Sequence, residues 1–177
     1  MNKDLSNLFD LTDKVCVVTG GTGIQGKRIT RGLAAYGAQV AIVDLDAEAA
    51  TLQAEEIASE YGVKTLGIAC NVAEKSDVEA MVERVVNHFG QIDVLHNNAA
   101  SKSKDPRDFF VPFEDFDFDV WRQVMSVNID GVFLVAQAVG KQMISQGHGG
   151  SIIQTSSTYG LVGPDFGIYE GSEYMGS

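Results

Sequence analysis

The clearest chemical signal in this sequence is a glycine-rich turn between a short apolar segment, Val15 to Val18, and an amphipathic helical pattern. Its glycines have the spacing Gly21-x-Gly23-x-x-Gly26, which is the pattern of a dinucleotide-binding turn. Gly21 allows the tight turn, Gly23 lets the backbone approach a pyrophosphate, and Gly26 lets the helix pack closely. Backbone N–H groups at the positive end of the helix would hold the anion. Because glycine is common, the spacing alone would also fit a turn without a ligand.

A carboxylate follows at the distance that such a turn predicts. A second apolar segment, Gln39 to Val43, ends in Asp44, about twenty residues beyond the turn. This carboxylate can accept both ribose hydroxyls of an adenosine, and it would repel a 2′-phosphate. Asp44 therefore predicts NAD(H) rather than NADP(H) as the cofactor. The alternative is a solvated residue at a strand end.

Alternating strands and helices must position these residues. The predicted strands are Val15 to Val18, Gln39 to Val43, Lys64 to Cys70, Ile92 to His96 and Ser151 to Thr155. The predicted helices follow the glycine turn as far as Gly37, span Ala47 to Tyr61, run from about Ser76 to Gly90, and span Asp119 to Gln146. Ser76-x-x-Glu79 predicts a capping box for the third helix. The alternation predicts an α/β fold with a doubly wound parallel sheet of the Rossmann type and the strand order 3-2-1-4-5.

Polar residues cluster where the predicted strands end. These residues are Gly20 to Gly26, Asp44, Asn71, Asn97 with Asn98, and Ser156 with Ser157. The carboxyl ends of parallel strands share one edge of the sheet, where such folds bind their ligands. The clustering therefore predicts a functional crevice at that edge.

Length, composition and charge limit the number of domains, the kinds of partner and the location that we expect. A chain of 177 residues with 45% hydrophobic residues suits one packed domain spanning residues 1–177. Its formal charge of −11 argues against nucleic acid and anionic membranes as partners. The first residues lack the apolar core of a signal peptide, and no uninterrupted apolar run approaches the roughly 18 residues that span a bilayer. We expect a cytoplasmic protein.

The cysteines and histidines predict neither a disulfide framework nor a metal site. Cys16 and Cys70 fall in separate strand patterns and form no CxxC pair, so we expect two reduced core residues. His88, His96 and His148 are not at ligand spacing. The sequence therefore predicts no metal site.

Taken together, these segments resemble the short-chain dehydrogenase/reductase family over nearly the whole chain. Thr19 to Gly26 resembles the family's TGxxxGxG turn, except that Ile24 stands where the family has its second glycine. Asn71-Val72 resembles the Asp-Val pair that contacts adenine, and Asn97 to Ala100 resembles the NNAG motif. The resemblance implies that NAD is bound by Gly20, Gly21, Gly23, Ile24, Gln25, Gly26, Asp44, Leu45, Asn71, Val72, Asn98 and Ala99.

The same resemblance implies two catalytic residues. Asn128 matches the asparagine of the family's N-x-x-G segment, and Ser157 matches the serine that ends the fifth strand. In the family, hydride passes between NAD(H) and the carbinol or carbonyl carbon of a secondary alcohol or ketone. The serine holds the substrate oxygen, the asparagine positions a water, and a tyrosine beside a lysine exchanges the proton. Without the resemblance, Ser156-Ser157 would equally fit a simple strand-end turn.

The tyrosine and lysine of that mechanism do not follow Ser157. Tyr169 has the expected spacing, but Glu173 stands where the lysine should be, and the last lysine is Lys141. One interpretation is a fragment that lacks the family's last strands; the other is a complete, catalytically inactive chain. We favour the fragment, the N-terminal part of a longer domain, because the strand from Ser151 to Thr155 would otherwise be a bare aliphatic edge.

Three functions stay open. They are an NAD-dependent dehydrogenase or reductase, an inactive nucleotide-binding remnant, and a scaffold that uses only the fold. The phenylalanines at positions 109, 110, 113, 116 and 118 would fit either a substrate pocket or packing at the start of the long helix. The resemblance also implies a homo-oligomer, either a tetramer or a dimer.

Overall fold

The computed structural model describes residues 8–103, 105–163 and 165–172 of the chain. Glu173, whose position in the Tyr169 pattern argued against a catalytic tyrosine, lies outside the described residues.

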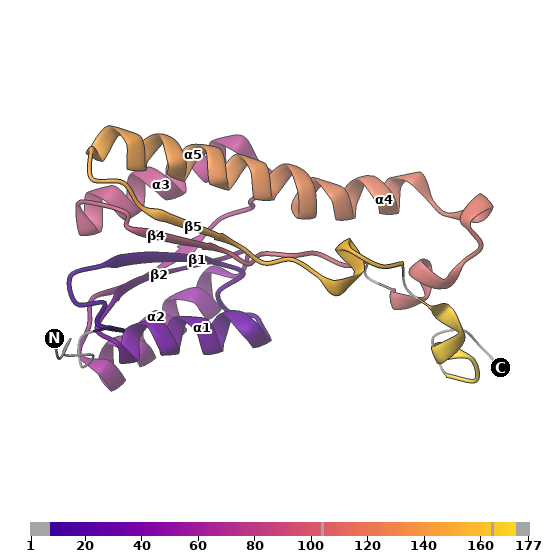
Figure 1. Cartoon of the computed structure of the whole chain (residues 1–177), viewed down its shortest axis with the longest axis horizontal. Helices are drawn as coiled ribbons and strands as arrows, with labels where there is room; N and C mark the ends of the chain where they lie inside the picture. Colours follow the sequence, from indigo (N-terminus) through magenta and orange to yellow (C-terminus); the bar gives the residue numbers. More distant parts are fainter. Residues whose placement is uncertain (1–7, 104, 164, 173–177) are drawn as a thin grey trace, which may run out of the picture.

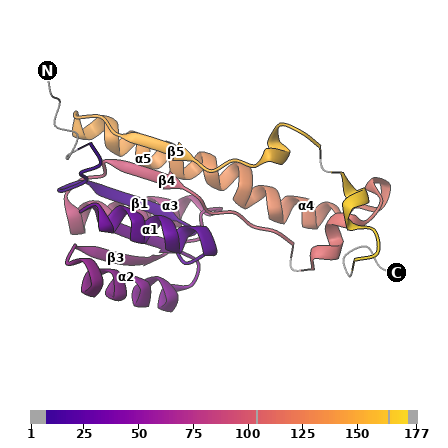
Figure 2. The same cartoon turned by 60° about the horizontal axis from the view of Figure 1, so that its bottom comes forward.

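Five parallel strands form one sheet in the order β3-β2-β1-β4-β5 (Figures 1 and 2). The strands are β1 (Val15–Thr19), β2 (Gln39–Asp44), β3 (Thr65–Ala69), β4 (Val94–Asn97) and β5 (Ser151–Gln154). Val17 lies opposite Ala41 of β2 and Leu95 of β4, so the central strands end nearly level. The predicted order and the doubly wound parallel fold are confirmed.

Helices cover both faces of this sheet (Figure 1). One face carries α1 (Ile24–Ala35) and α2 (Ala47–Tyr61), and the other carries α3 (Lys75–Phe89) and α5 (Val132–Gln146). Side chains alternate between the faces: Val15 and Val17 pack into the core beside α3 and α5, whereas Cys16 and Val18 pack beside α1 and α2. The near-continuous apolar strands are therefore buried on both sides.

The predicted long helix has three parts. It consists of α4 (Phe118–Met125), a π-helical turn (Ser126–Gly131) and α5, and α4 extends well beyond the sheet (Figure 1). Short 3-10 turns at Pro106–Phe110, Phe113–Asp115, Thr158–Gly160 and Phe166–Tyr169 accompany the overhang. By length and composition alone, the 29 residues Phe118–Gln146 could cross a membrane, but Val135 and Val139 of α5 are fully buried in the core.

Helix ends show where the sequence patterns hold and where one fails. Gly37, where the first helix was expected to end, is left-handed with φ of +92°. The capping box predicted for α3 is wrong: the helix begins at Lys75, its N-cap is Glu74, and no side chain caps it. Glu79 instead pairs with Lys75, at 3.8 Å.

Both cysteines are buried and unpaired, as expected. Burial raises the pKa of the Cys16 thiol to about 12 and that of Cys70 to about 11. Neither thiol is poised to react at neutral pH.

Candidate functional site

A groove of about 650 Å³ opens at the carboxyl ends of the strands. Turns after β1, β2, β3, β4 and β5 all contribute to its walls. Of the predicted site residues, it is lined by Gly20, Gly23, Ile24, Gln25, Gly26, Asp44, Leu45, Asn71, Val72, Asn98, Ala99 and Ser157. Gly21 and Asn128 lie beside the groove rather than on its wall. The structure thus brings together residues that are far apart in the sequence.

Close packing explains the glycines of the first turn. A side chain at Gly26 would collide with the carbonyl oxygen of Gly20, so α1 can begin this close to the turn only without one. The left-handed residue is Gly20, with φ of +62°, and not Gly21, to which the sequence pattern assigned the tight turn. Gly21 is needed for a different reason, because a Cβ there would lie 2.7 Å from Ile42 of β2.

The start of α1 is left open toward the groove. Its N-cap is Gly23, no side chain caps it, and its first turn contains no acidic residue. The first N–H groups of a helix have no acceptor within the helix, and they carry its positive dipole end. By contrast, Asp46 caps α2 by accepting from the N–H groups of Glu48 and Ala49. Of these two helices, α1 is therefore the one that offers free donors to an anion in this groove.

Asp44 lies next to that helix start, at the end of β2. Its Oδ2 accepts from the N–H of Thr22 at 2.9 Å, and its Oδ1 accepts from the N–H of Leu45 at 2.8 Å. Two carboxylate oxygens offer about four acceptor positions. The carboxylate is thus fixed in orientation while each oxygen can still accept a hydroxyl proton. Thr22, which the sequence did not single out, ties the glycine turn to β2.

The turn after β3 forms the adjacent wall of the groove. Asn71 accepts from the N–H of Ala73 through Oδ1 at 3.1 Å, which holds the turn in shape. Val72 is 7% exposed and packs against Gly131 at the end of the π-helical turn. The Asn71 side chain therefore supports its own turn, and Val72 provides an apolar wall.

A buried hydroxyl holds the turns after β1 and β4 together. Thr19 Oγ1 donates to Asn97 Oδ1 at 3.0 Å and accepts from the N–H groups of Asn98 and Ala99, both at 3.0 Å. Asn98 returns a bond from Nδ2 to the carbonyl of Thr19 at 3.1 Å. The motif of two asparagines is thus part of the scaffold that shapes the groove. A threonine at a strand end before glycine was the only sequence signal for this role.

Asn128 acts through the backbone of Ser101. Its Oδ1 accepts from the Ser101 N–H at 2.7 Å, and its Nδ2 donates to the Ser101 carbonyl at 2.9 Å. Asn128 lies in the π-helical turn, and Ser101 lines the groove. The asparagine therefore fixes the segment that leaves β4 and keeps one amide proton uncommitted.

Ser157 lies at the mouth of the groove and is exposed. Its Oγ accepts from the N–H of Tyr159 at 3.2 Å, so it also caps the next 3-10 turn. The serine can still donate its own proton. Tyr159 hydrogen-bonds to Tyr169, which raises the pKa of the Tyr159 phenol. This shift is opposite to that of a catalytic base.

Two of the phenylalanines near the long helix, Phe113 and Phe118, are exposed and do not line a closed pocket. Phe113 and Phe118 are 93% and 65% exposed, and Trp121 is 49% exposed. Arg122 lies over the Phe118 ring, and Phe110 packs edge-on against Tyr169 at 5.0 Å between centroids. The contact with Tyr169 joins the segment before α4 to the segment after β5.

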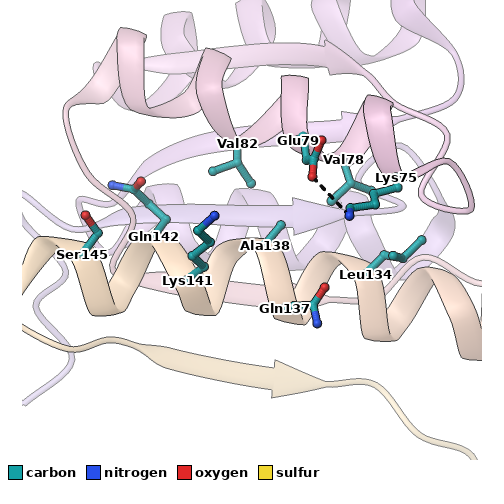
Figure 3. Close-up of a pocket in the computed structure, with 10 residues that line it drawn as sticks. All are labelled: Lys75, Val78, Glu79, Val82, Leu134, Gln137, Ala138, Lys141, Gln142 and Ser145. Carbon is teal, nitrogen blue, oxygen red and sulfur yellow. Dashed lines mark ion pairs between the residues drawn. The ribbon is translucent and has the colours of Figure 1, made fainter.

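Two further features lie apart from this site. Among the described residues, no group of histidine, cysteine or carboxylate side chains could hold a metal ion. A second groove, of about 600 Å³, lies between α3 and α5 and includes Lys75, Glu79 and Lys141 (Figure 3). It contains none of the predicted site residues.

The sheet and its groove define a doubly wound α/β protein with a groove at the carboxyl ends of the strands, where folds of this class bind their ligands. A model of the short chain dehydrogenase family matches residues 14–173. The chain therefore belongs to the short-chain dehydrogenase family, whose members use nicotinamide cofactors.

Individual relatives agree with this assignment. The chain is 36% identical over 157 residues to a D-threitol dehydrogenase of Mycolicibacterium smegmatis, covering 89% of this chain and 57% of that protein. It is 38% identical over 161 residues to an NADP-dependent mannitol dehydrogenase of Hypocrea jecorina, covering 89% and 58%. A crystal structure of NAD+-bound xylitol dehydrogenase superposes with a TM-score of 0.79 at 34% identity, covering 87% and 56%. The chain thus spans under two thirds of the length of these relatives.

Proposed function

We propose that this chain forms the NAD-binding part of an oxidoreductase. The enzyme would transfer hydride between NAD(H) and the carbinol or carbonyl carbon of a secondary alcohol or ketone. The observation that carries the proposal is the pairing of an open helix N-terminus at α1 with the Asp44 carboxylate beside it, on one wall of the groove. We further propose that residues 1–177 act as one dinucleotide-binding domain.

The residues present fit an adenine dinucleotide. The uncapped start of α1, with no acid in its first turn, suits a pyrophosphate even though the chain carries a formal charge of −11. Gly23 and Gly20 would bring the backbone close to it, and Asp44 would accept the ribose hydroxyls. Asn71, Val72 and Leu45 would flank the adenine, while Asn98 and Ala99 would line the path toward the nicotinamide.

Ser157 and Asn128 supply the chemistry available in this chain. When bound, the cofactor would accept or supply hydride. The Ser157 hydroxyl, at the groove mouth, would donate a hydrogen bond to the substrate oxygen and orient it. The uncommitted amide proton of Asn128 would hold a water beside Ser101.

The preference for NAD over NADP is part of this proposal. The names of the relatives include both cofactors, since one is NADP-dependent and another was crystallised with NAD+. A carboxylate at position 44 would repel the 2′-phosphate of NADP. Isothermal titration of the chain with NADH and with NADPH tests this. Tighter binding of NADPH would refute the preference, and binding of neither would leave a scaffold function.

An inactive nucleotide-binding protein is the second candidate. It is favoured by the absence of a Tyr-x-x-x-Lys pattern from the sequence and by the raised pKa of Tyr159. We therefore expect the 177-residue chain to bind NADH without oxidising alcohols or reducing ketones. Turnover by this chain in an assay of NADH production over a panel of secondary alcohols would exclude inactivity, whereas an absence of turnover fits both candidates.

We also propose a cytoplasmic homo-oligomer, either a tetramer or a dimer. Buried, unpaired cysteines suit a reducing compartment. The apolar helix from Phe118 to Gln146 leaves Ile129 and Phe133 exposed, which suits a subunit interface.

A further inference from the structure

A buried amide reaches the glycine turn from a helix that has no other part in the groove. Gln53 of α2 is 4% exposed. Its Nε2 donates to the carbonyl oxygen of Gly21 at 2.9 Å and to Thr30 Oγ1 at 2.8 Å. Thr30 Oγ1 in turn donates to the carbonyl oxygen of Gly26 at 2.9 Å. One side chain thus fixes the turn and, through Thr30, the first turn of α1.

The chemistry of the acceptors sets the orientation of this amide. The Gly21 carbonyl can only accept, so the NH2 group of Gln53 must face it. Among the described residues, Gln53 Oε1 is the buried side-chain atom left without a partner. An unpaired buried oxygen costs free energy. If position 53 served only the stability of the fold, an apolar side chain would avoid this cost. The glutamine is therefore explained by the hydrogen bonds that its NH2 group donates to Gly21 and Thr30.

Helix α2 is seated firmly enough to hold the amide in place. A Cβ at Gly67 of β3 would lie 2.5 Å from the Thr51 backbone nitrogen, so α2 packs directly on the strand. Thr65 Oγ1 donates to the carbonyl of Ala54 at 2.7 Å, one residue beyond Gln53. The amide therefore stands on a rigid element, which is what precise positioning requires.

Gly21 is held on both of its polar groups. Its N–H donates to the carbonyl of Val43 at 3.0 Å, and its carbonyl accepts from Gln53. The next two residues are held as well, because the Thr22 N–H donates to Asp44 and the Gly23 N–H donates to the carbonyl oxygen of Gly20 at 3.2 Å. Together, these hydrogen bonds set the direction of the free N–H groups at the start of α1.

We propose that Gln53 is a positioning residue for pyrophosphate binding: its amide holds Gly21 and Thr30 so that the N–H groups at the start of α1 converge on the anion. The proposal rests on the proposed NAD function. Gln53 would touch neither cofactor nor substrate.

The test compares two ligands that differ in the pyrophosphate. Gln53→Met removes both donors at similar length, and Gln142→Met is its control, because the Gln142 amide donates to Gln146 Oε1 within α5, away from the groove. We expect Gln53→Met to weaken ADP-ribose binding about tenfold, the loss of an oriented hydrogen bond. Adenosine, which lacks the pyrophosphate, should bind with an unchanged Kd by NMR titration. Gln142→Met should change neither Kd.

Thr30 provides a second arm if Gln53→Met does not fold. Thr30→Val removes the hydroxyl but keeps the shape, and Thr30→Ser restores the hydroxyl. We expect weakened ADP-ribose binding for the first and recovery for the second. Equal affinity of wild-type and Gln53→Met chains for ADP-ribose, or an equal loss for both ligands, would overturn the positioning role alone. A wild-type chain that binds neither NADH nor ADP-ribose would overturn the NAD function and this inference with it.

Discussion

At the scale of single residues, our proposal assigns the choice between NAD and NADP to Asp44. Its oxygens are oriented by the N–H groups of Thr22 and Leu45 but keep acceptor capacity. We predict that Asp44→Asn weakens NADH binding about tenfold, because a charged acceptor is lost. The same change should strengthen NADPH binding, because the repulsion of the 2′-phosphate disappears. Parallel calorimetric titrations with the two cofactors measure the ratio.

A nearby acid provides the control for Asp44. Asp46→Asn makes the same change in charge two residues away, and asparagine caps a helix about as well as aspartate. This variant should keep the wild-type ratio of NADH to NADPH affinity. If both variants shift the ratio equally, the net negative charge near the groove, and not the Asp44 contact, sets the preference for NADH over NADPH.

Two glycines of α1 separate close packing from helix propensity. Gly26→Ala would drive a methyl group into the Gly20 carbonyl, whereas a Cβ at Gly32 meets nothing within 4 Å. We predict that Gly26→Ala lowers the free energy of unfolding by about 2 kcal/mol and abolishes measurable NADH binding. Gly32→Ala should raise stability by about 0.5–1 kcal/mol, because glycine is a poor helix former. Urea unfolding and titration of both variants check this, and an undisturbed Gly26→Ala variant would contradict the packing argument.

At the scale of elements, the π-helical turn between α4 and α5 supports the segment that leaves β4. Asn128 holds both backbone polar groups of Ser101. We predict that Asn128→Ala speeds amide hydrogen exchange at Ser101 about tenfold or more, because both bonds are lost. Asn87→Ala, at an exposed position of α3, should leave that rate unchanged. Unaltered exchange in Asn128→Ala would show that the π-helical turn is not needed to order this segment.

Most of the elements could be predicted because their signals are local. Apolar runs and left-handed glycines lie within a few residues of each other, so strand order and helix positions followed from pattern and topology. The capping box at Ser76 failed because the helix begins at Lys75, so Ser76 lies inside the first turn and not at the N-cap. The π-helical turn also went unpredicted, because one extra residue in a helix leaves no periodic signal.

The candidate site could be predicted where chemistry and spacing coincide. Asp44 and the glycines were found because their distance along the chain follows from the strand and helix between them. Gln53, Thr22 and Ser101 were not found, because their contacts join elements far apart in the sequence and their residue types are common. Gly20 was not singled out as the left-handed position, and its close approach to Ala99 of another turn likewise joins segments far apart in the sequence.

At the scale of the whole molecule, an apolar face of the long helix stays uncovered. Ile129 and Phe133, one turn apart, are 60% and 59% exposed. We predict that the chain self-associates through this face and that Phe133→Glu shifts it toward a monomer of 19.0 kDa. Light scattering after gel filtration measures the mass. Leu52→Glu, an exposed apolar position on the opposite face of the sheet, should keep the wild-type mass. An unchanged mass for Phe133→Glu would place the interface elsewhere.

Helix α4 extends beyond the sheet, and this affects how the substrate specificity of such a protein could evolve. The turns that would bind the nucleotide follow strands that are buried in the core. The loops around Phe113 and Leu161 are exposed to solvent and lie near α4, beyond the sheet. Mutations can accumulate in those loops without strain reaching the strands. Under the proposed function, selection for a new substrate could therefore change the loops near α4 without changing the turns that would bind the cofactor.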